Sequence, residues 1–184
     1  MQLDLTVWRS LFAWVTKRSM VEPGAIELPY IRAIRTILWV FVGLSAIEVP
    51  IMDLILRPWP WIRYPFLALG IWGVVYMIGF VAAYEKLPHT LTSDALTLRA
   101  GPLAEYSIPR HLISAIKLDQ QSYESNKSRQ ILGNRFALLM AGSTNVTVEL
   151  SSSISIEHRH EVRQVDSISF YLDDPSLLRK ALSS

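Results

Sequence analysis

A glutamate inside an apolar stretch is the residue of this chain that most invites a chemical role. Glu48 lies within residues 34–56, a run made almost wholly of apolar side chains. A carboxylate deep in a membrane helix is costly, and such a group is a functional hypothesis by default. If a second helix returns antiparallel, Glu48 lies level with Gly73 and within a turn of Trp72 and Tyr76. Either aromatic side chain could then donate a hydrogen bond to Glu48.

Asp53 is the second acid of this stretch, and it lies within a turn of the end, where it can reach the membrane interface. We interpret Glu48, Tyr76, Trp72 and Asp53 as intramembrane polar contacts that fix the helix pair or meet another membrane protein. A proton or cation relay is the alternative. It is disfavoured because two helices are too few to enclose a transport path. Unchanged assembly and activity after Glu48→Gln would remove Glu48 from the functional residues.

Two histidines form the best metal candidate. His158 and His160 are two residues apart, so on a strand they would face the same side and could share an ion. Histidines in a polar segment are more often solvated, and we expect no metal and no other cofactor. The absence of cysteine excludes thiol catalysis and thiolate zinc sites. No phosphate-binding glycine loop or nucleophile motif is present, so the sequence favours a protein that is not an enzyme.

The elements that must position Glu48 are two apolar stretches, residues 34–56 and 64–84. Each is close to the roughly 20 residues that cross a bilayer as a helix. The connector, residues 57–63, is too short for a domain and predicts a hairpin. Small residues favour a close helix contact along Gly70 and Gly73. Basic residues are more numerous before the first stretch than in the connector, which predicts that both termini are cytoplasmic. The expected location is the inner (plasma) membrane, as a multi-pass protein.

A shorter amphipathic segment precedes the hairpin. Apolar side chains recur at three- and four-residue spacing over residues 3–16, which predicts a helix. We expect this helix to lie in the membrane interface, although it could instead pack on the hairpin or on the soluble domain. The residues expected to contact the membrane surface are Trp8, Arg9, Phe12, Lys17 and Arg18.

From residue 87 onward apolar and polar side chains alternate, which is typical of half-buried strands. Residues 151–161 are polar and are expected to form a loop. Asp174 and Pro175 favour the start of a final helix over residues 175–182. The predicted fold class is therefore a membrane α-helical hairpin plus a mainly-β (α+β) soluble domain, an antiparallel barrel or sandwich closed by a C-terminal helix.

A family resemblance is carried by strand and turn residues in this half of the chain. They follow the pattern D-x-L-x-L-x-x-G, then I-P, then two further isoleucines, at Asp94, Leu96, Leu98, Gly101, Ile108, Pro109, Ile113 and Ile116. This frame resembles bacterial pleckstrin-homology-like (PH-like) domains attached to membrane helices. The resemblance implies a PH-like barrel and a non-enzymatic role, and it carries over no ligand site.

These observations predict an interfacial helix and linker in residues 1–31, a transmembrane hairpin in 32–85 and a cytoplasmic PH-like domain in 86–184. The expected function is a scaffold or adaptor whose domain binds a protein or the membrane surface. The alternative is an accessory subunit of a membrane complex that docks through the hairpin. Expected partners are the lipid bilayer and a membrane protein or a second copy of the chain. A net charge of +2 with scattered basic residues argues against nucleic acid.

Overall fold

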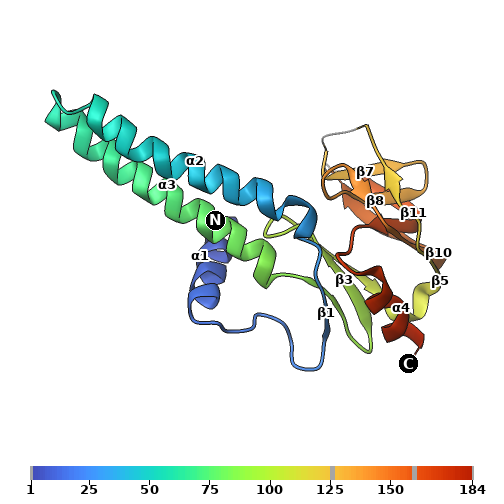
Figure 1. Cartoon of the computed structure of the whole chain (residues 1–184). Helices are drawn as coiled ribbons and strands as arrows, with labels where there is room; N and C mark the ends of the chain where they lie inside the picture. Colours follow the sequence, from blue (N-terminus) through green and yellow to red (C-terminus); the bar gives the residue numbers. More distant parts are fainter. Residues whose placement is uncertain (1, 125–126, 159–160, 184) are drawn as a thin grey trace. The chain divides into compact units, whose positions relative to one another are not determined.

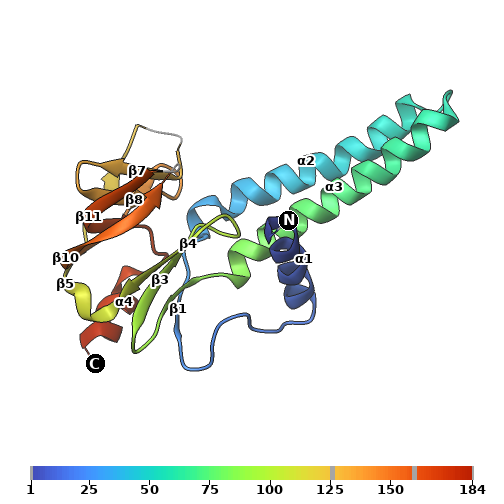
Figure 2. The same cartoon turned by 180° about the vertical axis from the view of Figure 1, so that it is seen from behind.

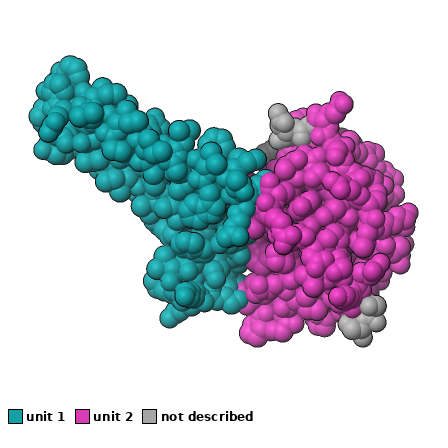
Figure 3. Space-filling model, viewed as in Figure 1, with its two compact units in different colours: residues 1–20, 34–86 teal, residues 21–33, 87–184 magenta. Residues whose placement is uncertain are grey.

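A computed structural model of the chain describes residues 2–124, 127–158 and 161–183. The chain divides into two compact units, which Figure 3 colours separately. The first unit comprises residues 1–20 and 34–86, and the second comprises residues 21–33 and 87–184. The amphipathic helix therefore belongs with the hairpin, whereas the linker after it belongs with the β-rich unit.

Three helices make up most of the first unit: α1 (Gln2–Val15), α2 (Arg32–Ile55) and α3 (Pro60–Lys86). Helices α2 and α3 run side by side in Figure 1 and in Figure 2. Both are long and apolar enough to cross a membrane. Few of their side chains are buried, unlike those of a core helix in a soluble protein. The helices thus leave most of their apolar surface exposed.

Helices α2 and α3 are antiparallel, because contacts that start near the connector continue in opposite directions along the two helices. The pairs that define this register are Asp53 with Arg63, Val49 with Gly70, Ser45 with Met77, and Arg35 with Glu85. This register places Glu48 level with Gly73, as the sequence predicts.

Helix α1 lies against the C-terminal half of α3. Val7, Ser10 and Ala13 are buried at intervals of three residues, so they form one face of α1. The Cβ that an alanine would add at Gly79 would lie 2.9 Å from Val7 Cγ1, which shows how closely the helices approach. The buried face of α1 therefore packs on the hairpin, which is one of the alternatives that the sequence left open.

The second unit is built from short strands that form open sheets. One sheet has the order β1-β2-β3-β4, a larger one has the order β5-β10-β11-β8-β7, and β6 pairs with β9. The first sheet contains β1 (Ile26–Leu28), β2 (His89–Leu91), β3 (Ala95–Arg99) and β4 (Glu105–Pro109). The others contain β5 (Ile113–Lys117), β6 (Gln121–Ser122), β7 (Arg129–Leu132), β8 (Arg135–Leu138), β9 (Ser143–Thr144), β10 (Val146–His158) and β11 (Glu161–Phe170). A short 3-10 helix, Arg110–Leu112, precedes β5.

A single apolar core joins these sheets. Its largest fully buried side chains include Phe136, Phe170, Leu96 and Ile108. The C-terminal helix α4 (Pro175–Ser183) contributes the buried Leu178 to this core. The observed class is α+β, with apolar helices, a mostly-β unit and a C-terminal helix, as the sequence predicts.

The start of α4 follows from its capping residue. The carboxylate of Asp174 accepts hydrogen bonds from the backbone N–H of Ser176 at 3.0 Å and from its hydroxyl at 2.7 Å. Proline at the first helical position has no N–H that needs a partner. The cap predicted from the sequence is therefore confirmed.

Several predicted features of the β-rich unit are wrong. Residues 151–158 are part of the long strand β10 rather than a loop, and residues 154–158 pair with β11 after a shift in register between Glu149 and Ile154. Residues 159–160 of the predicted loop lie outside the described residues. The pair β8–β11 is parallel, so the unit is not purely antiparallel. Residues 26–28 form β1, which pairs with β2, so the predicted linker completes a sheet.

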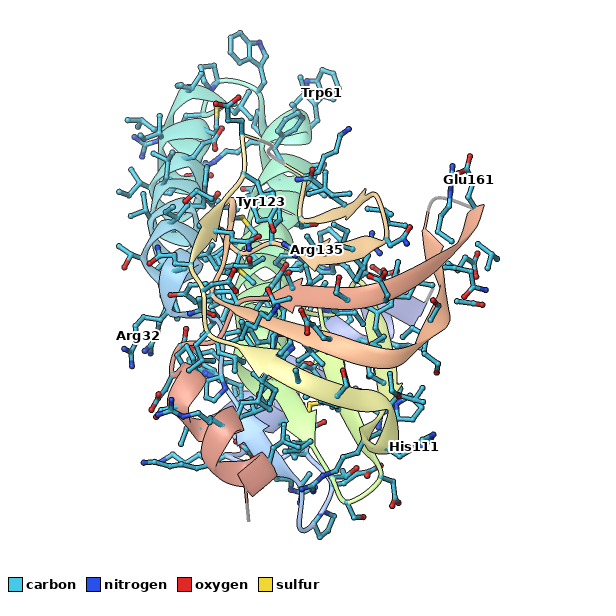
Figure 4. The ribbon with its side chains drawn as sticks, turned by 90° about the vertical axis from the view of Figure 1, so that its right-hand side faces the viewer. Arg32, Trp61, His111, Tyr123, Arg135 and Glu161 are labelled. Carbon is cyan, nitrogen blue, oxygen red and sulfur yellow. The ribbon has the colours of Figure 1, made fainter. Side chains whose placement is uncertain are left out.

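A small polar network illustrates how the loops are held. Tyr123 and Arg135 are labelled in Figure 4, and both donate hydrogen bonds to the side-chain oxygen of Gln121, at 2.8 and 3.0 Å. Gln121 itself lies in β6, which pairs with β9.

Candidate functional site

A groove between α2 and α3 is the candidate site of the hairpin. Its cavity measures about 470 Å³ and is lined mainly by apolar side chains, together with Ser45, Glu48, Asp53 and Arg63. The side chains come from facing turns of two apolar helices, whose antiparallel register brings residues distant in sequence together. Pockets with a few convergent polar groups in an apolar lining are typical binding sites.

Glu48 is the polar residue of this groove whose charge is least compensated. It is exposed, and among the residues that the structure describes no hydrogen bond or ion pair reaches its carboxylate. It lies about 10 Å along the helix from the end of α2 at Ile55. The helix pair alone therefore supplies no partner for this acid.

Asp53 is paired rather than solvated. The Arg63 guanidinium donates from Nε to Asp53 Oδ1 at 2.6 Å and from Nη2 to Asp53 Oδ2 at 2.8 Å. This fork of two parallel hydrogen bonds is the strong geometry for an arginine–carboxylate pair. It joins α2 to α3 at the connector end of the hairpin. Asp53 thus has a cationic partner, whereas Glu48 has none among the described residues.

Tyr76 does not bond to Glu48. Its hydroxyl donates to Asp4 Oδ1 at 3.1 Å, and its ring packs against Trp72 with ring centroids 5.5 Å apart. The ring of Trp8 meets Tyr76 edge-on with centroids 6.2 Å apart. The structure therefore brings Tyr76 and Trp72 together beside α1 and gives the tyrosine an acid that the sequence reasoning did not consider.

The two glycines expected to form a contact face behave differently. An added Cβ at Gly70 would lie 2.9 Å from Val49 Cγ2, so the helices approach closely there. At Gly73 an added Cβ would meet nothing within 4 Å, and this residue lines the groove instead. Gly73 thus leaves space beside Glu48, whereas Gly70 closes the helix contact.

A charged cluster near the ends of α1, α2 and α3 was missed by sequence reasoning. The indole N–H of Trp14 donates to Glu85 Oε2 at 2.8 Å, and Arg35 Nε lies 3.3 Å from Glu85 Oε1. An acid that directly follows an apolar run, and an arginine at the start of the facing helix, are the sequence signals that point to this pair.

The residues expected at the membrane surface are exposed on α1 and the turn after it. Phe12 is 61% exposed and Trp8 is 38% exposed, while Arg9, Lys17 and Arg18 are also exposed. Their surface is available to a ligand or a membrane.

The buried histidine of the β-rich unit is structural. His89 stacks on Tyr30 with ring centroids 4.1 Å apart, and its Nδ1 accepts a hydrogen bond from the backbone N–H of Arg99 at 2.8 Å. Burial, with Arg99 nearby, lowers the pKa of His89 from 6.5 to about 3. The ring is therefore neutral at physiological pH and packs as an aromatic group.

A metal centre has no support in the described parts of the chain. Within residues 2–124, 127–158 and 161–183, no three His, Asp or Glu side chains gather as an ion would require. Of the predicted histidine pair, His160 and the side chain of His158 lie outside what the structure describes.

A basic hollow lies on the β-rich unit. Its volume is about 440 Å³, and its charged lining consists of Lys127, Arg129, Arg163 and Glu161. Figure 4 labels Glu161 at the beginning of β11. Glu161 pairs with Arg163 at 2.7 Å, and Arg129 donates to the Tyr106 hydroxyl at 3.2 Å. The hollow has an excess of positive charge.

No family model matches this chain, and neither does any curated protein or any solved structure.

Proposed function

We propose that this chain is a non-enzymatic accessory subunit of the inner membrane, whose hairpin docks on a helix of another membrane protein. The exposed, uncompensated Glu48 in the interhelical groove is the observation that carries this proposal. Intramembrane acids commonly pair with other polar groups or mark functional paths. A partner helix with a lysine or arginine at this depth would compensate the charge of Glu48.

A second copy of the chain is a poorer partner for Glu48 than a different protein. Neither α2 between Arg35 and Arg57 nor α3 between Arg63 and Lys86 contains a basic residue. Two copies would therefore place carboxylates together without a cation at their depth. A different protein can supply the cation, and for this reason we assign the groove to a heterologous partner.

In this proposal α2 and α3 cross the membrane, both termini are cytoplasmic and the connector lies outside. The larger number of basic residues before the apolar run of α2 than in the connector supports this orientation. The β-rich unit would then be a cytoplasmic domain of PH-like type, as the family resemblance implies.

The test compares three full-length, affinity-tagged proteins purified in mild detergent: the native chain, Glu48→Gln and Glu22→Gln. Glu22→Gln makes the same chemical change in an exposed part of the linker. We expect a stoichiometric membrane protein to copurify with the native chain and with Glu22→Gln, and to be lost from Glu48→Gln. Exchanging charges, with Glu48→Lys and an acid at the partner's cationic residue, should restore the complex.

Retention of the same partner by Glu48→Gln would contradict the docking proposal. So would recovery of the native chain only as a homo-oligomer that Glu48→Gln leaves intact. Either result would show that docking on another protein does not depend on Glu48.

The second candidate function is that of a scaffold or adaptor, in which the β-rich unit binds an acidic partner protein. The basic hollow of Lys127, Arg129 and Arg163 favours it. Charge reversal in Lys127→Glu should remove an acidic partner while preserving the partner that depends on Glu48. If Lys127→Glu instead weakens only the binding of full-length protein to anionic vesicles, the hollow binds the membrane surface.

A further inference from the structure

A second hollow lies beside the C-terminal half of α1. It measures about 450 Å³, and its lining includes Trp8, Arg9, Phe12 and Arg18. Two walls are aromatic and two side chains carry guanidinium groups. This combination distinguishes it from the groove at Glu48, whose uncompensated group is an acid.

The backbone turn that follows α1 shapes this hollow. Lys17 adopts a left-handed conformation with φ of 54°, which L side chains rarely adopt. The backbone N–H of Arg18 donates to the carbonyl of Ala13 at 2.8 Å, which ends the helix and reverses the chain. The Arg18 guanidinium carbon then lies 5.9 Å from the centroid of the Phe12 ring. The turn thus holds a cation above an aromatic wall.

The positive charge of the hollow is uncompensated. Among the described residues, no carboxylate forms an ion pair with Arg9, Lys17 or Arg18. The nearest acid of α3, Glu85, already accepts a hydrogen bond from Trp14 and pairs with Arg35. An anion could therefore bind without displacing an internal partner.

The level of the hollow along α3 indicates the source of that anion. Trp14 reaches Glu85, so the C-terminal part of α1 lies level with the residues that end the apolar run of α3. If α3 spans the bilayer, this is the level of the lipid headgroups. The exposed side chains of Trp8 and Phe12 would face the adjoining acyl chains.

We propose that this hollow is a binding site for one anionic phospholipid. Arg9 and Arg18 hold the phosphate, with Lys17 adding to the positive potential, and an acyl chain lies against Trp8 and Phe12. Free phosphate would satisfy the cations but would leave both aromatic walls uncovered. The inference depends on the proposed function only for the membrane crossing of α2 and α3, and it is independent of Glu48.

The test measures lipid binding by the full-length protein in detergent, using native mass spectrometry with added phosphatidylglycerol or phosphatidylcholine. The double variant Arg9→Gln/Arg18→Gln removes the proposed phosphate ligands. Arg57→Gln removes one exposed charge from the connector and serves as the control. Arg18→Lys keeps the charge and loses the fork of donors.

We expect phosphatidylglycerol to bind more tightly than phosphatidylcholine, and to weaken about fivefold for each charge removed from the hollow. Arg57→Gln should bind like the native chain, and Arg18→Lys should lie between the native chain and the double variant. Added inorganic phosphate should not displace the lipid.

The proposal is overturned if the double variant binds phosphatidylglycerol within twofold of the native chain, or if Arg57→Gln weakens binding equally. Displacement by inorganic phosphate would make the hollow a site for a soluble anion. Alkaline extraction of native membranes separates these failures from failure of the proposed function: release of the protein would refute the membrane crossing itself, whereas retention without lipid preference would refute only the lipid site.

Discussion

The guanidinium of Arg63 donates one hydrogen bond to each carboxylate oxygen of Asp53, across the connector that joins α2 to α3. The pair joins two helices of the hairpin at its closed end, where about three quarters of each side chain is shielded. Removal of one partner would leave the other charge without compensation in an apolar setting.

We therefore expect Arg63→Gln to lower the thermal unfolding midpoint of the full-length protein in detergent. The double variant Asp53→Asn/Arg63→Gln should be more stable than Arg63→Gln, because it removes the orphaned carboxylate as well. Arg57→Gln, an exposed change in the same connector, should have little effect. Equal midpoints for Arg63→Gln and Arg57→Gln would show that the fork does not stabilise the hairpin.

The contact between α1 and α3 depends on the absence of a side chain at Gly79. Its added Cβ would lie 2.9 Å from Val7 Cγ1 and 3.4 Å from the Val7 carbonyl oxygen. Gly79→Ala should destabilise this packing by about 1–3 kcal/mol. Gly73→Ala, which meets nothing within 4 Å, should be neutral or slightly stabilising. Hydrogen exchange of the α1 amides would measure the difference, and similar protection in both variants would contradict the close contact.

Burial of His89 predicts that stability depends on pH. The pKa of His89 is about 3 in the folded chain, whereas in the unfolded chain it has the usual histidine value of 6.5. Below pH 6.5 the unfolded chain therefore binds a proton that the folded chain does not. Stability should decrease as the pH falls from 6.5 to about 3, with a slope of up to about 1.4 kcal/mol per pH unit from this group.

Denaturant unfolding of the full-length protein at a series of pH values would measure this slope. His89→Gln removes the titrating group, so it should flatten the dependence while lowering stability at pH 8 through the lost stacking on Tyr30. An unchanged slope in His89→Gln would assign the pH dependence to other residues.

Tyr30 fastens the segment before α2 to the β-rich unit. Its hydroxyl accepts a hydrogen bond from the backbone N–H of Gly101 at 2.7 Å, in a buried setting. Tyr30→Phe would leave that N–H without its partner and should cost about 1–3 kcal/mol. Tyr64→Phe changes an exposed ring and serves as the control. Equal thermal unfolding midpoints for Tyr30→Phe and Tyr64→Phe would show that the buried hydrogen bond from Gly101 contributes little to stability.

Local sequence patterns were sufficient for the elements whose signals lie within a few residues. Long apolar runs predict α2 and α3, alternation predicts strands such as β3 and β11, and Asp174 with Pro175 predicts the start of α4. The level of Glu48 with Gly73 also follows from the sequence, because a short connector and a fixed rise per residue determine the register of an antiparallel pair.

The partners of the candidate residues required the tertiary structure. Asp4 bonds to Tyr76, and Trp14 bonds to Glu85, across more than seventy residues of chain. The parallel pairing of β8 with β11 is likewise non-local. Periodicity reports which face of an element is apolar, but it does not report which other element covers that face.

By itself, the sequence determined that Glu48 is an acid within an apolar helix, because residue type and hydropathy are local properties. The tertiary structure alone decided that Tyr76 bonds to another acid, that Arg63 compensates Asp53 and that Glu48 is left exposed. The physical reason is that charge compensation depends on distances between side chains brought together by folding, and these distances are absent from the order of residues.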